Sequence, residues 1–305
     1  MSVRLRIIRA APSSTVQDAG RFGALQHGVG ASGPMDREAF ENAGALLQAA
    51  STAGIEFTRA GLDVVVEGDG TTRAAFAGGD FLLRINGRPT PWGAAASLQR
   101  DDRLEVTPGP AGNYGYVRFD HEIDVPMVMG SRATSLVAGL GGLKGRALAA
   151  GDILPLKAAG AGTGPAHTGP SPSASDAPIR FVWGIHAELF TPGLRQAFAE
   201  KQFRVSDRLD RMGVRLVDES LVFAGRPILS LVSDAIVAGD IQILGDGTPI
   251  VLMRDHQPTG GYPRIATVIS ADLDRFAQMR PGARLAFEPV TLHKARFLYL
   301  ASRAR

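Results

Sequence analysis

The stretch DIQILGDGTPIVLMRDHQPTGGYPRIATVIS, residues 240–270, contains the clearest fold signal in this chain. Its first half has two apolar segments on either side of a Gly-Asp-Gly turn, which predicts a β-hairpin at Asp246-Gly247. Its second half ends in a further apolar segment, Ala266–Ser270, and the polar run DHQPTGGYPR, Asp255–Arg264, comes before it. We therefore expect core strands that hold a polar loop rigidly between them.

Short strand signals separated by Gly and Pro recur along the rest of the chain, and such a pattern favours barrels or sandwiches. A second tight hairpin is predicted at Asn86-Gly87. The other expected strands are Val3–Arg9, Asp63–Glu67, Arg73–Gly78, Phe81–Ile85, Tyr114–Phe119, Ile179–Gly184, Arg226–Ser233 and Arg284–Val290. The fold class predicted from these signals is mainly β with a few short helices.

Three helices are predicted where apolar residues recur at helical spacing. They cover Pro34–Gln48, Thr191–Lys201 and Ala271–Met279. Ser32 or Asp36 would favour the N-terminus of the first helix, because a short polar or acidic side chain satisfies the free N–H groups there.

The chain of 305 residues is long enough for two domains. The segment Ala158–Pro178 is rich in Gly, Pro, Ser and Ala, which predicts a flexible linker between an N-terminal lobe, 1–157, and a C-terminal lobe, 179–305. His167 lies in this linker, and we expect it to be solvated. Both lobes contain a turn followed by an alternating strand, so we expect two similar β-barrel-like lobes. These segments are Asp101–Val106, Gly151–Leu156 and Gly282–Phe287.

Composition argues against several classes of protein. The net charge is only +3 and the arginines are scattered, so the sequence does not indicate a nucleic-acid-binding protein. There is no cysteine, which excludes disulfides, thiol nucleophiles and Cys-ligated metals. No window has the roughly 18 apolar residues of a membrane span, and the N-terminus lacks a signal-peptide core. We expect a cytoplasmic protein that does not enter a membrane.

The loop Asp255–Arg264 combines a carboxylate, an imidazole, a primary amide, a hydroxyl, a phenol and a guanidinium group. A plain connection between two strands does not need this set of groups, so we interpret the loop as functional. His256 would suit a general acid or base, and Gln257 with Thr259 would hold an amide group of a substrate. The candidate catalytic residues are Asp255, His256 and Tyr262.

Other polar and Gly-rich segments extend the candidate site. GVGASG, Gly28–Gly33, lacks the preceding strand of a dinucleotide-binding fold, and we interpret it as a turn or an anion-binding helix N-terminus. QDAGRFG, GSRAT with the following GLGGLKGR, and SDRLDRMG supply further polar groups near glycines, beginning at residues 17, 130, 139 and 206. The candidate substrate-binding residues are Gln17, Asp18, Ser32, Asp36, Ser131, Arg132, Asp207, Arg211, Gln257, Thr259, Gly260, Gly261 and Arg264.

Several sequence motifs of known chemistry do not occur. The chain has no phosphate-binding P-loop, no G-x-S-x-G nucleophile motif, no pair of histidines at metal-ligand spacing and no biotin-carrying Met-Lys-Met. We therefore expect no metal site in this chain, and we expect any nucleotide or biotin to be supplied by another protein.

These blocks together resemble the biotin-dependent carboxyltransferase family, which includes urea amidolyase-related proteins, allophanate hydrolase subunit 2, KipA proteins and the C subunit of bacterial 5-oxoprolinase. The resemblance covers about residues 3–290 and is carried by segments in the same order as in the family. They are TVQDAGRFG, GVGASGPMDREAFENAGALL, IDVPMVMGSRATSLVAGLGGLKGRALAAGDILPL, SDRLDRMGVRL, AGDIQILGDGTPIVLMRDHQPTGGYPRIATVISADL and RPGARLAFEPV.

The resemblance implies paired, cyclophilin-like β-barrel lobes and a protein that works with partners. The resemblance to the C subunit of 5-oxoprolinase implies a KipI-like partner subunit, a LamB/YcsF-like partner subunit, ATP shared with these partners and a small lactam or amide substrate. The resemblance to urea carboxylase implies carboxybiotin supplied in trans and transfer of its carboxyl group to urea or a related amide. A KipA-like regulatory binding protein and a self-sufficient hydrolase are further hypotheses. A free-standing chain without a biotin domain is most similar to the C subunit of 5-oxoprolinase.

Overall fold

The computed structural model describes residues 3–162, 177–225 and 230–303. The chain divides into two compact units. The N-terminal unit comprises Met1–Ala24 and Ala31–Ser173, and the C-terminal unit comprises Leu25–Gly30 and Ala174–Arg305. Most of the predicted linker, including His167, lies outside the described residues.

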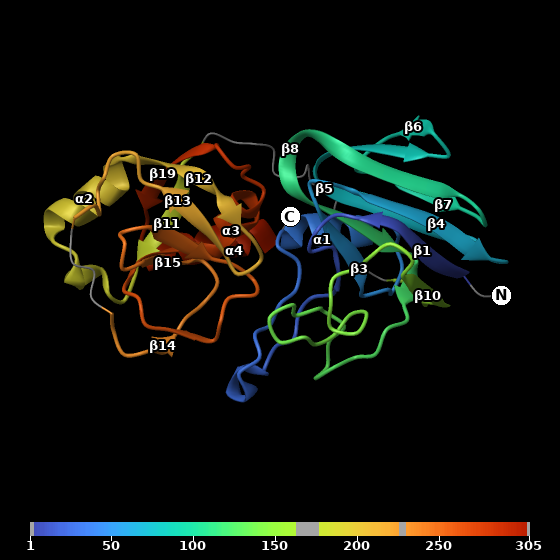
Figure 1. The fold of residues 1–305 in the computed structure, drawn as a ribbon, viewed down its shortest axis with the longest axis horizontal. Helices are drawn as coiled ribbons and strands as arrows, with labels where there is room; N and C mark the ends of the chain where they lie inside the picture. Colours follow the sequence, from blue (N-terminus) through green and yellow to red (C-terminus); the bar gives the residue numbers. More distant parts are fainter. Residues whose placement is uncertain (1–2, 163–176, 226–229, 304–305) are drawn as a thin grey trace. The chain divides into compact units, whose positions relative to one another are not determined.

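The described part of the N-terminal unit consists of one sheet and one α-helix. Its elements are β1 (Val3–Ala10), β2 (Thr15–Gln17), α1 (Arg37–Ala45), β3 (Gly54–Thr58), β4 (Leu62–Gly68), β5 (Thr72–Ile85), β6 (Arg88–Thr90), β7 (Ala95–Leu98), β8 (Arg103–Phe119), β9 (His121–Ile123) and β10 (Ile153–Ala158). The main path of the ten-stranded sheet is β2-β3-β8-β4-β1-β10-β9, and β5 with β6 and β7 joins it through β8. Figure 1 shows β8 curling around one side of this unit.

The strand β5 is continuous where the sequence predicts two strands. The register against β8 shifts around Asp80, and Gly78 has φ +107°. A Cβ at Gly78 would overlap the carbonyl oxygen of Tyr114, so only glycine allows the two backbones to approach here. These irregularities bend the strand without ending it, which explains why the sequence alone suggests a break.

The apolar core of the N-terminal unit lies on the inner face of this sheet. Trp92 packs against Phe57, Phe76 and Phe81, with ring centroids 5.3–6.4 Å apart. The predicted Asn86-Gly87 hairpin is confirmed: Ile85 pairs with Arg88, and both turn residues have positive φ.

The C-terminal unit is a closed barrel with helices around it. Its elements are η1 (Leu25–His27), β11 (Ile179–Trp183), η2 (Ala187–Leu189), α2 (Pro192–Glu200), β12 (Gln202–Leu209), β13 (Gly213–Val217), β14 (Asp234–Ala235), β15 (Asp240–Ile243), β16 (Pro249–Leu252), β17 (Thr259–Gly260), β18 (Arg264–Val268), α3 (Ser270–Ala277), β19 (Arg284–Pro289) and α4 (Leu292–Arg303). The barrel order is β11-β18-β15-β16-β13-β12-β19, and β19 closes on β11 in parallel. This barrel and the curled sheet confirm the predicted mainly β fold class.

The barrel core contains an aromatic cluster from four elements. Phe198 of α2 stacks on Phe287 of β19, with centroids 4.9 Å apart, and Phe181 and Phe203 contact the same pair. Thr191 caps α2, because its side chain accepts a hydrogen bond from the backbone N–H of Leu194. The helix predicted at Thr191–Lys201 is therefore present with nearly the predicted bounds.

Two further sequence predictions differ from the structure in detail. The hairpin at Asp246-Gly247 is present, but five residues separate the paired Ile243 and Pro249, and the Asp246 carboxylate supports the turn by accepting from Thr248 N–H at 2.9 Å. The strand predicted at Arg226–Ser233 is wrong over its described part, because residues 230–233 form no strand.

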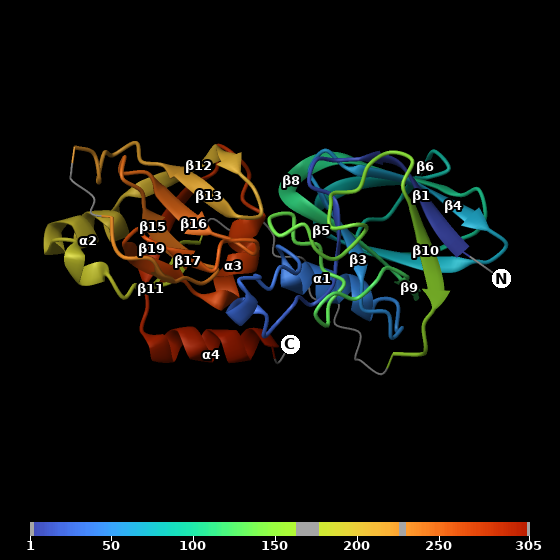
Figure 2. The same cartoon turned by 60° about the horizontal axis from the view of Figure 1, so that its bottom comes forward.

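The helix α4 was not predicted from the sequence. Figure 2 shows it lying along the outside of the barrel. None of its described residues is buried, so the apolar positions form no core-facing stripe for a sequence pattern to detect.

Candidate functional site

The Asp255–Arg264 segment follows barrel strand β16, ends at the first residue of β18 and supplies one strand of a small two-stranded sheet; we call this segment the flap. Thr259 and Gly260 form β17, which pairs antiparallel with β14 at Ala235 and Asp234. A Cβ at Gly260 would lie 2.7 Å from Gln242 Nε2, so the backbone lies directly on the Gln242 side chain. Close packing requires the second glycine, since a Cβ at Gly261 would lie 2.8 Å from the backbone carbonyl oxygen of Leu231.

Arg264 fastens this flap to the barrel. Its Nη2 donates to Asp234 Oδ2 at 2.7 Å, and its Nη1 donates to the carbonyl oxygen of Ala235 at 2.7 Å. Nη1 also lies 3.4 Å from Asp240 Oδ2, and the Arg264 side chain is only 8% exposed. Asp240 in turn accepts a hydrogen bond from Thr267 at 2.7 Å. We name Asp234, Asp240, Gln242 and Arg264, together with His186, the Arg264 cluster.

His186 belongs to this cluster, although it is not among the residues predicted from the sequence. Its Nδ1 accepts a hydrogen bond from the backbone N–H of Arg264 at 3.3 Å. Burial, and then the adjacent Arg264 charge, lower the pKa of His186 below its ordinary value. The pKa of Asp234 is also lowered, first by the N–H of Ala235 and then by the Arg264 side chain. The only sequence signal for His186 is its place three residues after the strand β11.

Asp255 and Arg211 form a buried bidentate ion pair at the start of the flap. Arg211 Nε donates to Asp255 Oδ2 at 2.8 Å, and Nη2 donates to Oδ1 at 3.0 Å. The backbone N–H of Asp255 also donates to the carbonyl oxygen of Arg211 at 2.7 Å. The side chains are only 3% and 1% exposed. Both carboxylate oxygens thus face a guanidinium, which fixes the strand end from which the loop departs.

The remaining loop side chains are more exposed. Gln257, Thr259 and Tyr262 are exposed, and His256 is half-buried with Nδ1 2.6 Å from the carbonyl oxygen of Gln257. Buried ion pairs at both ends therefore hold a segment that exposes an amide, a hydroxyl and a phenol. Whether His256, Tyr262 or Asp255 takes part in catalysis stays a prediction.

In the N-terminal unit, Asp18 organises a tight turn. Its Oδ1 accepts from Gly20 N–H at 2.9 Å and from Ser131 Oγ at 2.6 Å, and its Oδ2 accepts from Arg132 N–H at 2.6 Å. Arg132 Nε donates to the carbonyl oxygen of Val125 at 3.2 Å. We name Asp18, Ser131 and Arg132 the Asp18 cluster.

Gln17 lies next to this cluster and joins three segments. Its Nε2 donates to Thr15 Oγ1 and to the carbonyl oxygen of Thr134, and its Oε1 accepts from Gly33 N–H at 3.1 Å. Ser32 is buried with φ +55°, and within the described residues its Oγ has no hydrogen-bond partner. A buried hydroxyl in a strained backbone is a polar group that a ligand would satisfy.

Asp36 and Asp207 have local roles in the structure. Asp36 caps α1, since its Oδ1 accepts from Ala39 N–H at 2.9 Å, and its own N–H donates to Tyr116 Oη. The helix N-terminus is thus occupied by the chain's own carboxylate, three residues beyond the Gly28–Gly33 motif. Asp207 is exposed and accepts from Ser206 Oγ at 3.2 Å, whereas Arg211 is directed to Asp255.

The described residues include no group of three or more His, Cys, Asp or Glu side chains placed to hold a metal ion. Among the helices of the described ranges, none has the length and apolar character that crossing a membrane requires.

Comparisons with known proteins agree on one family. A family model described as the carboxyltransferase domain, subdomain A and B, matches residues 27–289. The 5-oxoprolinase C subunit of Escherichia coli (strain K12) is 35% identical over 95% of this chain and 93% of its own length. The urea amidolyase of Lachancea kluyveri is 30% identical over 93% of this chain, which spans only 17% of that protein. The crystal structure of the K. lactis urea amidolyase matches with a TM-score of 0.89 at 26% identity, over 99% of this chain and 19% of that chain.

Proposed function

This chain belongs to the carboxyltransferase domain family with subdomains A and B, and from that membership we propose that it is a subunit of an ATP-dependent 5-oxoprolinase. The main support for the proposal is the length of the match. This chain aligns with 93% of the Escherichia coli 5-oxoprolinase C subunit. By contrast, the urea amidolyases contain this region as a small part of a much longer chain. The match over nearly the whole length of that subunit supports a role as a subunit that acts with partners.

The geometry of the flap supports a small lactam or amide as substrate. Such a substrate presents a carbonyl oxygen and an N–H side by side, and binding it needs a donor and an acceptor on one rigid segment. Gln257 and Thr259 supply these groups, and the Arg211–Asp255 pair and Arg264 hold the backbone that carries them. In this proposal Asp255 positions the loop. His256 and Tyr262 lie close in sequence to Gln257 and Thr259, and they transfer a proton to or from the bound amide.

The sequence has no P-loop for the phosphates of ATP. In this proposal ATP is shared with two partner subunits, one KipI-like and one LamB/YcsF-like. This chain would then bind and orient the lactam.

The alternative is a carboxyltransferase that moves a carboxyl group from carboxybiotin to urea or a related amide. The match to the K. lactis urea amidolyase, with a TM-score of 0.89, favours it. The ureido ring of biotin presents amide edges like those of a lactam, so the donors and acceptors of the flap fit it as well. Carboxybiotin would supply the carboxyl group, and the residues of the flap would bind and orient the accepting amide.

The test is to co-express the chain with the products of its neighbouring genes and to purify the assembly. We expect ATP-dependent release of glutamate from 5-oxoproline, and we expect no release when this chain is omitted. Biotin-dependent carboxylation of urea, without glutamate release, would reverse the order of the two proposals.

A further inference from the structure

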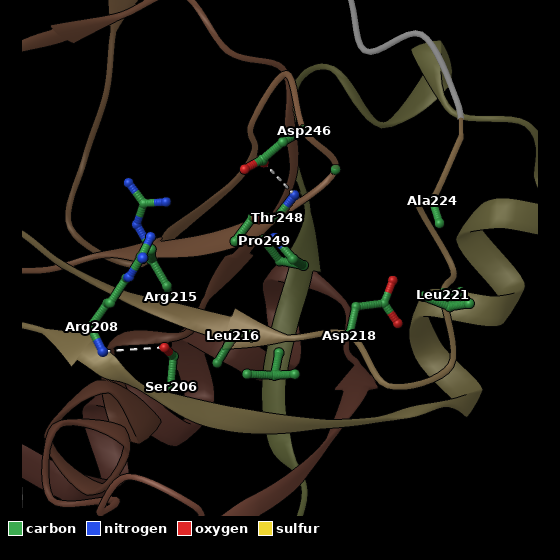
Figure 3. Close-up of a pocket in the computed structure, with 12 residues that line it drawn as sticks. Ser206, Arg208, Arg215, Leu216, Asp218, Leu221, Ala224, Asp246, Thr248 and Pro249 are labelled. Carbon is green, nitrogen blue, oxygen red and sulfur yellow. Dashed lines mark hydrogen bonds between the residues drawn. The ribbon is translucent and has the colours of Figure 1, made fainter.

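A cavity of about 330 Å³ lies in the C-terminal unit, apart from the residues of the Arg264 cluster. Figure 3 shows its walls. They come from β12, from β13 with the loop after it, and from the turn between β15 and β16. No residue of the Asp255–Arg264 loop lines it.

A wide bulge in β12 forms one wall of the cavity. Val205 pairs with Leu216 and Leu209 pairs with Val214, so residues 206–208 of β12 stand opposite Arg215 alone. Ser206 Oγ accepts from the N–H of Arg208 at 3.1 Å and stabilises the bulged backbone. Bulges of this kind redirect side chains, and they are frequent next to functional sites.

The bulge brings two arginines to the same wall. Figure 3 shows the side chains of Arg208 and Arg215 directed to one side of the cavity. Within the ranges that the structure describes, neither guanidinium forms an ion pair with a carboxylate. The charge of Arg215 acts on the Asp246 carboxylate of the same wall, and a bound carboxylate would still accept bidentate hydrogen bonds from these guanidinium groups.

Carboxylates lie elsewhere on the cavity wall. Asp218 Oδ2 accepts from Phe223 N–H at 3.1 Å, but its Oδ1 is covered and has no hydrogen-bond partner among the described residues. Hydrogen bonds from Thr248, and to a smaller extent the charge of Arg215, lower the pKa of Asp246. A covered carboxylate oxygen without a donor is costly, and a cation bound beside Asp218 would relieve this cost.

An apolar floor separates the two charged sides. It is formed by Leu216, Val217 and Pro249, and Figure 3 shows Leu216 and Pro249 between the arginines and Asp218. A ligand that fits this order has an anionic end, a short aliphatic middle and a cationic end.

We propose that this cavity binds a short-chain zwitterion of the ω-amino-acid class, with its carboxylate at Arg208 and Arg215 and its ammonium group at Asp218. The proposal does not rest on the function proposed for the flap, because the two sites share no residue. Binding to the purified chain is therefore measurable without the partner subunits.

The test uses isothermal titration of the full chain with 4-aminobutyrate. Butyrate lacks the ammonium group and butylamine lacks the carboxylate, so each removes one charged end. We expect saturable binding of 4-aminobutyrate, and we expect both single-charge compounds to bind at least about tenfold more weakly. Binding of butyrate as tight as that of 4-aminobutyrate, or no saturation by 4-aminobutyrate up to about 10 mM, would overturn the proposal.

Variants then locate the site. Arg215→Gln and Asp218→Asn each remove one charge and keep the side-chain shape, and we expect each to weaken binding of 4-aminobutyrate at least about tenfold. The exposed Arg208→Gln serves if either of these variants fails to fold. Arg284→Gln, an exposed arginine on β19, is the matched control and should leave binding unchanged. Undiminished binding in both Arg215→Gln and Asp218→Asn would show that the zwitterion binds elsewhere and would overturn the assignment.

Discussion

In the N-terminal unit, Asp18 and Gln17 direct their polar atoms to the chain's own turns, whereas in the C-terminal unit Gln257 and Thr259 remain exposed. Gln257 and Thr259 can remain exposed because other, buried groups hold the flap in place. These groups are the Arg211–Asp255 pair and Arg264. A polar motif can therefore either build a turn or leave its groups open to a ligand. Hydrogen-bond partners, rather than residue types, distinguish the two cases.

The two tryptophans make this comparison measurable, because each unit contains one. Trp92 lies in the core of the N-terminal unit, and Trp183 packs against Phe181 and Phe198 in the C-terminal unit. Trp92→Phe leaves fluorescence that reports on the C-terminal unit alone, and Trp183→Phe leaves a reporter of the N-terminal unit.

The largest effect is expected from Arg211→Ala. It leaves the Asp255 carboxylate buried without its guanidinium, which should lower the free energy of unfolding of the C-terminal unit by about 3–5 kcal/mol. Urea unfolding followed by Trp183 fluorescence measures it. The double variant Arg211→Met/Asp255→Leu, which removes both charges, should lose much less stability. An equal loss in both variants would contradict the view that the pair is an electrostatic anchor.

Asp18→Ala should destabilise the N-terminal unit by about 2–3 kcal/mol, because Gly20 N–H, Ser131 Oγ–H and Arg132 N–H all lose their acceptor. Unfolding followed by Trp92 fluorescence should show the loss, while the Trp183 transition should stay in place. The exposed Asp124→Ala is the control. A stable Asp18→Ala protein would mean that this carboxylate is free for a ligand.

The helices α1 and α2 offer a matched pair of glycine substitutions. A Cβ at Gly44 of α1 would overlap the guanidinium of Arg118, which lies 4.7 Å from the Phe40 ring and donates to the carbonyl oxygen of Ser51. Gly44→Ala should therefore cost about 1–2 kcal/mol, since overpacking exceeds the gain in helix propensity. Gly193→Ala of α2 meets open space and should change stability by less than about 0.5 kcal/mol. Equal changes of stability in Gly44→Ala and Gly193→Ala would contradict the close packing of Arg118 against Gly44.

The smallest effect is expected on the loss of stability at acid pH, to which His186 contributes. Its folded-state pKa lies below the ordinary value of 6.5, so the unfolded chain binds more protons as the pH falls. The stability contribution is thus present above about pH 6.5 and is lost as the pH falls through the lowered pKa. His186→Gln should flatten this decline in the Trp183 unfolding transition, whereas the exposed His293→Gln should not. If stability declines equally with falling pH in both variants, His186 does not interact electrostatically with the Arg264 cluster.

Much of the fold followed from local patterns. The Asn86-Gly87 turn and the helix capped by Thr191 depend on neighbouring residues, and both were predicted. The continuity of β5 was missed, because it depends on a backbone approach between Gly78 and Tyr114, residues far apart in sequence. The helix α4 was missed because it has no buried stripe.

For the candidate site, the sequence indicated the polar segments but not their partners. Asp255 was proposed as a catalytic residue, and only the structure shows both its oxygens bound by Arg211. His186 and Asp234 were not recognised, because the pairing of β11 with β18 and of β14 with β17, rather than sequence proximity, brings them to Arg264.

The most direct test of the flap's role measures the assembled enzyme with Gln257→Ala/Thr259→Ala in this chain. These side chains are exposed, so the Trp183 unfolding transition should stay unchanged while ATP-dependent glutamate release from 5-oxoproline falls by about 100-fold in kcat/KM. Gln196→Ala on the exposed side of α2 should retain full activity. Full activity of the double variant would contradict the claim that the flap presents its groups to the substrate.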